Sequence, residues 1–417
     1  MSARMPPPQP SPRERDAAGE LADDRGFPLG RVAGVRLVAD WSLLVIFGLI
    51  VLNLGIGVLP SWHPGWSAPL TWAVAVLAAI LFFGSVAVHE LSHALVARRY
   101  DIPVRRITLF VFGGMAQIER EPPSPRAELW MAIVGPITSL VIGFAATFLG
   151  VLLAGGPADT AAADPSGFFR ALGPFATLLV WLGPINIMLG VFNLVPGFPL
   201  DGGRVLRAIL WGATGDLRRA TRWASWAGQA VGWTLMAIGV TMLFGVWYPF
   251  FGGGPVSGLW LILIGWFLNN AARASYTQLM VREALEGIAV EELMRADPVV
   301  VPPDLTLDEL IRDRYLHTGQ REFPVVDHGG HLLGQVNVGV ARTIAREQWG
   351  HRTVVEIMTP AAQLHPMRPG DPAISAMPLL AEHDPIPVVA GDHVLGVIHS
   401  QDLMRWLAVH PEAQPRA

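Results

Sequence analysis

The residues of this chain best suited to chemistry lie together as His89-Glu90-Leu91-Ser92-His93. Residues four apart share one face of a helix, so both imidazoles can bind one metal ion, while Glu90 lies about 100° further round, near a metal-bound water. Zinc lowers the pKa of a bound water to about 7 and polarises a carbonyl, and a neighbouring carboxylate can accept and return a proton. The spacing therefore predicts a zinc hydrolase.

The position of Glu90 within a long apolar run favours a functional role for this motif. Glu90 is the only acidic residue between Trp41 and Arg98. An ionisable group inside a membrane span is costly, and by default it indicates a functional site.

A catalytic zinc usually has three protein ligands and one open position, so a third ligand is expected. Asp201 is the candidate, in a segment that contains Pro196, Pro199 and three glycines. These residues should unwind the helix and free the carboxylate to turn toward His89 and His93. The alternative is that Asp201 caps a helix that starts near Arg204.

The elements that position these residues must be membrane helices. Only 15% of the residues are charged and 52% are hydrophobic, with a mean hydropathy of +0.41, whereas soluble proteins carry about 25% charged residues. This composition excludes a single soluble enzyme. The net charge of -4 offers no basic surface for nucleic acid, and the absence of cysteine excludes disulfides and thiolate metal sites.

Four long segments contain no Asp, Glu, Lys or Arg, and two of them are broken by proline-rich turns. Because a bilayer span needs about 20 apolar residues, they predict six spans. The expected spans are 41–60, 70–97, 129–153, 174–200, 226–247 and 256–272.

Arginine is concentrated on one side of these spans. Six arginines precede the first span, six lie in 98–126 and five in 204–222, whereas the other three connections contain Arg170 alone. The positive-inside rule therefore predicts a multi-pass protein of the cell membrane with both termini in the cytoplasm.

Two segments outside the spans have distinctive patterns. Residues 1–35 are rich in Pro, Arg, Asp and Glu, so they are expected to be a disordered cytoplasmic arm. Residues 101–120 are β-branched and aromatic around Gly113-Gly114, which predicts a short hairpin near the cytoplasmic face. The hairpin is either a covering loop or a clamp that pairs with an unwound substrate as an added strand.

After the last span the composition becomes that of a soluble protein, and an internal repeat appears with a period near 63 residues. Met294 recurs as Met358, Pro324-Val-Val326 as Pro387-Val-Val389, and Gly334 as Gly396. The pattern resembles a tandem pair of cystathionine-β-synthase (CBS) domains over 285–410, with halves near 291–347 and 354–408.

Many CBS pairs bind adenine nucleotides through a Thr or Ser followed three residues later by Asp. Here the second half has His399 and Asp402, and the first has Asn337 and Val340. The resemblance thus implies Asp402 as a nucleotide contact, and a structural or dimerising module without ligand is the alternative.

The HExxH motif together with Asn193-x-x-Pro-x-x-Pro-Leu-Asp201-Gly resembles the site-2 protease family of intramembrane zinc metalloproteases, in its CBS-containing branch. This resemblance implies one zinc per chain bound by His89, His93 and Asp201, with Glu90 as acid/base. Three more positions match family motifs and are candidates for contact with substrate or oxyanion: Gly135, Asn186 and Asn193. Gly135 could instead permit close helix packing, and Asn193 could bond to freed backbone.

The predicted fold is thus a polytopic α-helical membrane protein of about six transmembrane helices (36–280) with a C-terminal cytoplasmic α/β tandem CBS module. The expected function is hydrolysis of a peptide bond in or near the transmembrane segment of a single-pass membrane protein within the lipid bilayer. By resemblance, such substrates are anti-sigma factors or regulatory precursors, and the CBS pair would regulate access or form a homodimer. The alternatives are a CBS-regulated transporter or channel, and an inactive scaffold.

Overall fold

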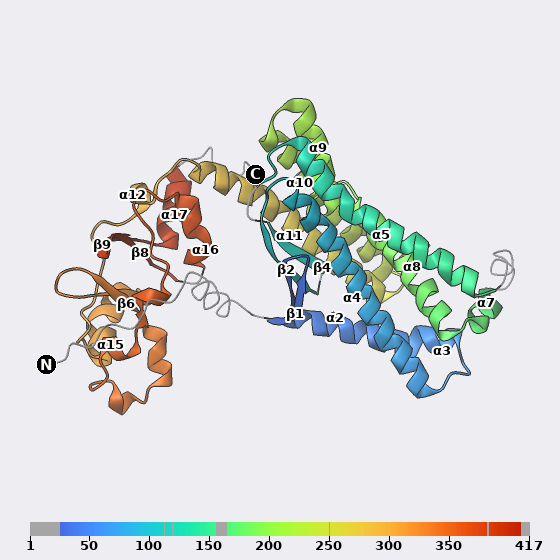
Figure 1. The fold of residues 1–417 in the computed structure, drawn as a ribbon, viewed down its shortest axis with the longest axis horizontal. Coiled ribbons are helices and arrows are strands. Elements are labelled where there is room, and N and C mark those ends of the chain that lie inside the picture. The colour runs from blue at the N-terminus through green and yellow to red at the C-terminus, as the bar shows by residue number, and fades with distance from the viewer. Residues whose placement is uncertain are drawn as a thin grey trace. The chain divides into compact units, whose positions relative to one another are not determined.

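The computed structural model describes residues 26–111, 113–118, 121–155, 165–249, 251–381 and 383–409. The chain divides into two compact units, Met1–Tyr276 and Thr277–Ala417. Figure 1 shows the helices and strands of both units in chain order.

The predicted number of membrane spans is confirmed for the described residues, where six helical segments are long and apolar enough to cross a bilayer. The first, Trp41–Trp62, joins α2 (Trp41–Leu52), a π-helical turn η1 (Asn53–Val58) and α3 (Leu59–Trp62). The others are α4 (Ala68–Arg98), α5 (Pro125–Leu153), α8 (Pro174–Asn193), α10 (Leu217–Leu243) and α11 (Pro255–Leu285). The short helices α7 (Pro165–Ala171) and α9 (Asp201–Thr214) lie between spans.

Some span boundaries differ from the prediction for local reasons. Helix α8 ends at Asn193 rather than residue 200, because the segment rich in proline and glycine that follows is irregular. Helix α10 begins at Leu217 rather than residue 226, since Asp216 caps it by accepting a hydrogen bond from the backbone N–H of Arg219. Charged residues thus extend the helix beyond its apolar core.

Glycine lets the central helices approach one another closely. Helices α5 and α8 run side by side (Figure 1). A Cβ atom on Gly143 would lie 2.7 Å from the backbone nitrogen of Ile187, and one on Gly183 would lie 2.8 Å from that of Thr147. Such backbone-to-backbone packing is typical of membrane helix pairs.

A four-stranded sheet completes the first unit, in the order β1-β2-β3-β4. Its strands are β1 (Gly26–Val32), β2 (Val35–Asp40), β3 (Val104–Phe110) and β4 (Gly113–Ile118). The predicted hairpin is confirmed as the antiparallel pair β3 and β4, and β2 runs parallel to β3. Residues of β2 and β3 pack on α4, where Ala94 and Ala97 are fully buried. The sheet is therefore anchored on the helix that carries HExxH.

The end of the predicted disordered arm differs from the structure. Residues 26–32 form β1 and Val35 begins β2, whereas residues 1–25 lie outside the described residues. Only part of β1 is apolar, so its ordering comes from pairing with β2 over Gly26–Val32 rather than from a hydrophobic pattern of its own.

The second unit contains the two repeats. The first comprises α12 (Val290–Leu293), α13 (Leu307–Glu309), η2 (Leu310–Tyr315), α14 (Leu316–Thr318), β5 (Glu322–Val326), β6 (Leu332–Asn337), η3 (Val338–Thr343) and η4 (Arg346–Gln348). The second comprises α15 (Val354–Ile357), β7 (Thr359–Pro360), η5 (Ala361–Gln363), η6 (Ala373–Ser375), α16 (Ala376–Leu380), β8 (Ile386–Ala390), β9 (His393–Ile398) and α17 (Ser400–Val409). The first repeat ends in two short 3-10 helices, η3 and η4, where the second ends in the longer helix α17.

The repeated glycines allow the two repeats to exchange strands. The segment that begins the second repeat pairs with β6, while Arg295, which begins the first, pairs with Val397 in β9. A Cβ atom on Gly334 would lie 2.4 Å from the carbonyl oxygen of Thr359, and one on Gly396 would lie 2.5 Å from that of Arg295. The two repeated glycines therefore mark the points where the backbone of one repeat pairs closely with that of the other.

Candidate metal centre

The three predicted metal ligands lie together in the first unit. The Nε2 atoms of His89 and His93 are 3.1 Å apart, and each lies 3.2 Å from Oδ2 of Asp201. Both imidazoles are buried, and the ligand atoms of all three residues lie within 4.8 Å of one another. Two imidazole nitrogens and one carboxylate oxygen are a donor set that suits a catalytic zinc with an open fourth position.

Helix α5 orients both imidazoles through contacts with their Nδ1 atoms. His93 contacts the carbonyl oxygen of Met131 through Nδ1, and His89 contacts Oγ of Ser139 through Nδ1 at 2.8 Å. A carbonyl only accepts, so His93 carries its proton on Nδ1 and presents the Nε2 lone pair to the metal position. Outer contacts of this kind fix the ring orientation of metal-binding histidines.

Gly135 lies between these two contacts on the same face of α5. A Cβ atom there would lie 2.1 Å from Nε2 of His93 and 2.7 Å from Nε2 of His89. Only glycine therefore lets the α5 backbone approach the Nε2 atoms of both imidazoles, and the predicted contact of Gly135 with substrate or oxyanion stays a prediction. Ser139 was not predicted, although it lies four residues after Gly135 in the same span.

The chain unwinds before Asp201, as the prolines and glycines predicted. Helix α9 begins at Asp201, and its N-terminal cap, Leu200, makes no side-chain hydrogen bond. The carboxylate of Asp201 instead points to the imidazoles. Backbone of the irregular segment folds against the first turn of α9, so that a Cβ on Gly203 would lie 2.3 Å from the nitrogen of Phe198. The geometry thus favours the ligand role over the capping alternative.

Glu90 lies beside the hairpin. It is half-buried on α4, one residue after His89. A Cβ atom on Gly114 of β4 would lie 2.3 Å from Cγ of Glu90. The backbone of β4 therefore passes directly beside the predicted acid/base.

A buried ion pair that the sequence did not indicate joins α9 to α5. Arg207 donates from Nε to Oε1 of Glu128 at 2.6 Å and also pairs with Glu121 at 3.3 Å. Glu128 is fully buried in the first turn of α5, where the helix dipole favours a negative charge. The guanidinium also lies 5.4 Å from the ring centre of Phe198 in the irregular segment. This pair fixes the helix that carries Asp201.

The two predicted asparagines occupy different environments on α8. Asn186 is fully buried and donates to the carbonyl oxygen of Leu182 at 3.0 Å, while its Oδ1 has no hydrogen-bond partner among the described residues. Asn193 is the last residue of α8 and is half-buried. Their contact with substrate remains a prediction.

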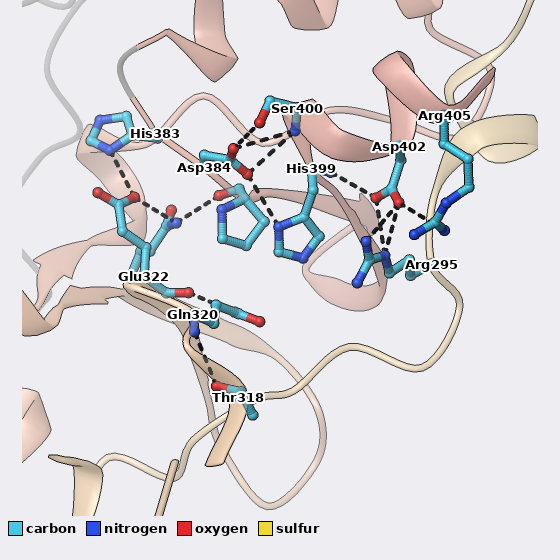
Figure 2. A network of polar contacts seen from close by, with 12 residues as sticks. Arg295, Thr318, Gln320, Glu322, His383, Asp384, His399, Ser400, Asp402 and Arg405 are labelled. Atoms are coloured by element: carbon cyan, nitrogen blue, oxygen red, sulfur yellow. Dashed lines mark hydrogen bonds and ion pairs between the residues drawn. The ribbon is translucent and has the colours of Figure 1, made fainter. Parts of the chain in front are cut away.

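In the second unit, Asp402 lies within a polar network (Figure 2). Its Oδ1 accepts from Nε and Nη2 of Arg295 at 2.9 and 2.8 Å, and its Oδ2 accepts from the backbone nitrogen of His399 at 3.1 Å. The ring of His399 contacts Asp384 at 3.1 Å. The carboxylate expected to contact a nucleotide is therefore already bonded to an arginine.

Comparison with known proteins identifies the family. The family model described as Peptidase family M50 matches residues 77–237, and that of the CBS domain matches 290–339 and 354–409. Rip3 of Mycobacterium tuberculosis, named as a zinc metalloprotease, is 33% identical over 392 residues, which cover 93% of this chain and 94% of that protein. The chain belongs to peptidase family M50.

The chain is also similar to a second named metalloprotease and to a solved structure. The protein sll0528 of Synechocystis, also named as a zinc metalloprotease, is 33% identical over 79% of this chain and 81% of its own length. A solved site-2 protease from Methanocaldococcus jannaschii aligns with 60% of this chain and 95% of its own at 27% identity, with a TM-score of 0.39. Its family and its relatives of 33% identity make this M50 protein a multi-pass zinc metalloprotease of the site-2 type with a CBS pair. The transporter or channel alternative is not supported.

Replacing Gly135 with Ala should weaken zinc binding about tenfold or more, because the added methyl displaces both imidazoles. Gly84→Ala on α4 is the matched control, since no atom lies within 4 Å of a Cβ there. Zinc affinity of the purified proteins, measured by competition with a chelator, checks this. Equal affinities in the two variants would contradict the proposed close approach.

Arg207→Gln should lower the free energy of unfolding by about 3–5 kcal/mol, because it leaves Glu128 buried and unpaired. The double variant Glu128→Leu/Arg207→Leu should recover much of this loss, since it removes both charges. Arg312→Gln, which breaks an exposed ion pair with Asp308, should change stability by less than about 1 kcal/mol. Thermal unfolding in detergent distinguishes these outcomes, and similar effects of Arg207→Gln and Arg312→Gln would refute the role of the buried pair.

Proposed function

We propose that this M50 protein is an intramembrane zinc endopeptidase that cleaves a peptide bond in or near a transmembrane segment of a membrane protein. The observation that carries the proposal is the convergence of His89, His93 and Asp201 at one point within the membrane-spanning unit, with Glu90 beside them. Ionisable groups are placed within membrane helices only at a cost, so a functional centre is the best explanation of the cluster.

The residues present fit one zinc ion per chain. His89, His93 and Asp201 would hold it, and their donor atoms are those of catalytic zinc sites. When bound, the ion supplies Lewis acidity toward the scissile carbonyl. Glu90 accepts a proton from the attacking water and passes it to the nitrogen of the leaving amine. Hydrolysis thus consumes one water and leaves a carboxyl and an amino terminus.

The site lies at a depth that suits a cytoplasmic supply of water. His89 precedes Arg98, near the end of α4, by nine residues, or about 13 Å along the helix. With both termini in the cytoplasm, as the arginine distribution predicts, the centre lies on the cytoplasmic side of the bilayer. A substrate helix must unwind locally to reach it, and the cytoplasmic fragment is then released. By family resemblance, we propose single-pass anti-sigma factors or regulatory precursors as substrates.

The edge of the sheet is a suitable surface for an unwound substrate. Strand β4 is the last strand in the order of the sheet, and its Gly114 lies against Glu90. A substrate that paired with β4 as a fifth strand would be held in extended form next to the acid/base. We therefore favour the clamp over the covering loop.

The CBS pair is proposed as a regulatory module that forms a homodimer or responds to an adenine nucleotide. Asp402 is bonded to Arg295, so a nucleotide that used this carboxylate would have to displace the arginine. The nucleotide response would then depend on opening the ion pair with Arg295, while Arg405 lies 3.7 Å from the same carboxylate.

Glu90→Gln should retain zinc but reduce cleavage of a membrane-helix reporter in proteoliposomes by about 100-fold or more, because the amide cannot transfer the proton. Glu291→Gln, which removes an exposed carboxylate from α12 in the second unit, is the control for the loss of an acid and should leave cleavage unchanged. Mass spectrometry of the products locates the cut. Full cleavage by Glu90→Gln would contradict the role of Glu90. No cleavage by wild type that holds zinc would contradict the proposal and favour the inactive scaffold.

A proline scan of β4 tests the strand-pairing step. Successive backbone N–H groups of a strand point to opposite sides, so Met115→Pro and Ala116→Pro remove one outward and one inward donor. The proline that removes the N–H facing away from β3 should abolish cleavage while zinc binding and stability stay intact. The proline that removes the N–H facing β3 should lower stability. If neither variant loses cleavage while both fold, the substrate does not pair with β4.

Titration calorimetry of the full-length protein with ATP, ADP and AMP tests the nucleotide response. Arg295→Gln should tighten binding severalfold by freeing Asp402, and Asp402→Asn should abolish it. An absence of heat with all three nucleotides in both wild type and Arg295→Gln would remove the nucleotide from the proposal.

A further inference from the structure

A cavity of about 740 Å³ lies between α9 and α10, on helix faces that the metal centre does not use. From α9 it is lined by Leu206, Leu210 and Thr214, which are four residues apart and so form one stripe. From α10 the lining includes Trp223 and Trp226. The volume is within the range of sites for small ligands.

The walls of this cavity are apolar and its side chains are accessible. The exposed fractions of Trp223 and Trp226 are 55% and 50%. The groove belongs to α10, a candidate membrane span, so lipid rather than water covers its apolar part. An acyl chain is the occupant that matches such a wall.

Arginine borders the cavity at the beginning of α10. Arg219 lines it, and the guanidinium of Arg222 lies 5.3 Å from the ring centre of Trp226. The Nε of Arg222 is buried and has no hydrogen-bond partner among the described residues. Arg219 pairs with Asp216 at 3.1 Å, but both side chains are exposed, and such pairs contribute little. Arg219 therefore brings a positive charge to the lining of the cavity, and Arg222 brings a second one beside its Trp226 wall.

Tryptophan and arginine at the end of a membrane span are typical of the bilayer interface, and basic pockets between membrane helices bind anionic head groups. We propose that the cavity between α9 and α10 binds one anionic phospholipid. Its phosphate lies against Arg219 and Arg222, and an acyl chain follows Leu206 and Leu210. The proposal does not depend on the peptidase activity.

The bound lipid would support the segment that carries Asp201. The same helix α9 begins with this carboxylate. Helix α10 also holds the irregular segment, since its Ala224 carbonyl accepts a hydrogen bond from the nitrogen of Phe198 at 3.1 Å. Lipid between the two helices therefore contacts both elements that position the third metal ligand.

Native mass spectrometry of the full-length protein in detergent tests the site with phosphatidylglycerol and phosphatidylcholine of identical acyl chains. Wild type should retain phosphatidylglycerol more tightly, and each of Arg219→Gln and Arg222→Gln should weaken it about fivefold without affecting phosphatidylcholine. Arg170→Gln in α7, which removes a positive charge elsewhere, is the matched control.

A second pair of variants tests the apolar part independently of charge. Leu210→Trp should fill the cavity and weaken both lipids, whereas Ile209→Trp adds the same group on the exposed neighbouring position of α9 and should change neither. Thermal unfolding of each variant confirms that it folds. Equal binding of the two lipids by wild type would overturn the proposal. Equal losses of lipid binding in Leu210→Trp and Ile209→Trp would also overturn it. A third contradicting result would be a substrate helix that cross-links to position 210 and is not displaced by phosphatidylglycerol.

Discussion

The whole membrane unit depends on placing two imidazoles and one carboxylate at a single point between apolar helices. His89 and His93 come from adjacent turns of one helix, but Asp201 comes from a segment more than a hundred residues later. Polar groups in such surroundings must be satisfied by other polar groups. The backbone of α5 meets this need because Gly135 lets it come close enough for Met131 and Ser139 to orient both rings.

Bringing Asp201 to this point requires a break in helical structure and a means to hold it. Proline and glycine end α8 at Asn193, and the chain turns back against α9. The buried pair of Arg207 and Glu128 then fixes α9 on α5. The break lets the chain turn toward the imidazoles, and the ion pair holds α9 in place, so that Asp201 is fixed beside His89 and His93.

Much of this arrangement could be predicted from local sequence. The HExxH spacing, the charge-free spans, the hairpin and the break before Asp201 each follow from a periodicity or from residue types with known backbone effects. The contacts of Ser139 and of Arg207 with Glu128 could not be predicted, because they join distant segments with no local pattern. Strand β1 was missed for the same reason, since its order comes from pairing. The Arg295 partner of Asp402 was missed because it arises from strand exchange between repeats.

The most direct test of the account is the zinc content of the purified full-length protein, measured by inductively coupled plasma mass spectrometry. Wild type and Glu90→Gln should each carry about one zinc per chain, while His89→Ala and Asp201→Ala should lose most of it, because each removes one of the three proposed ligands. Asp216→Ala, an acidic residue at the start of α10, should have no effect. Metal retained by Asp201→Ala at the wild-type level, or none in wild type, would contradict the account.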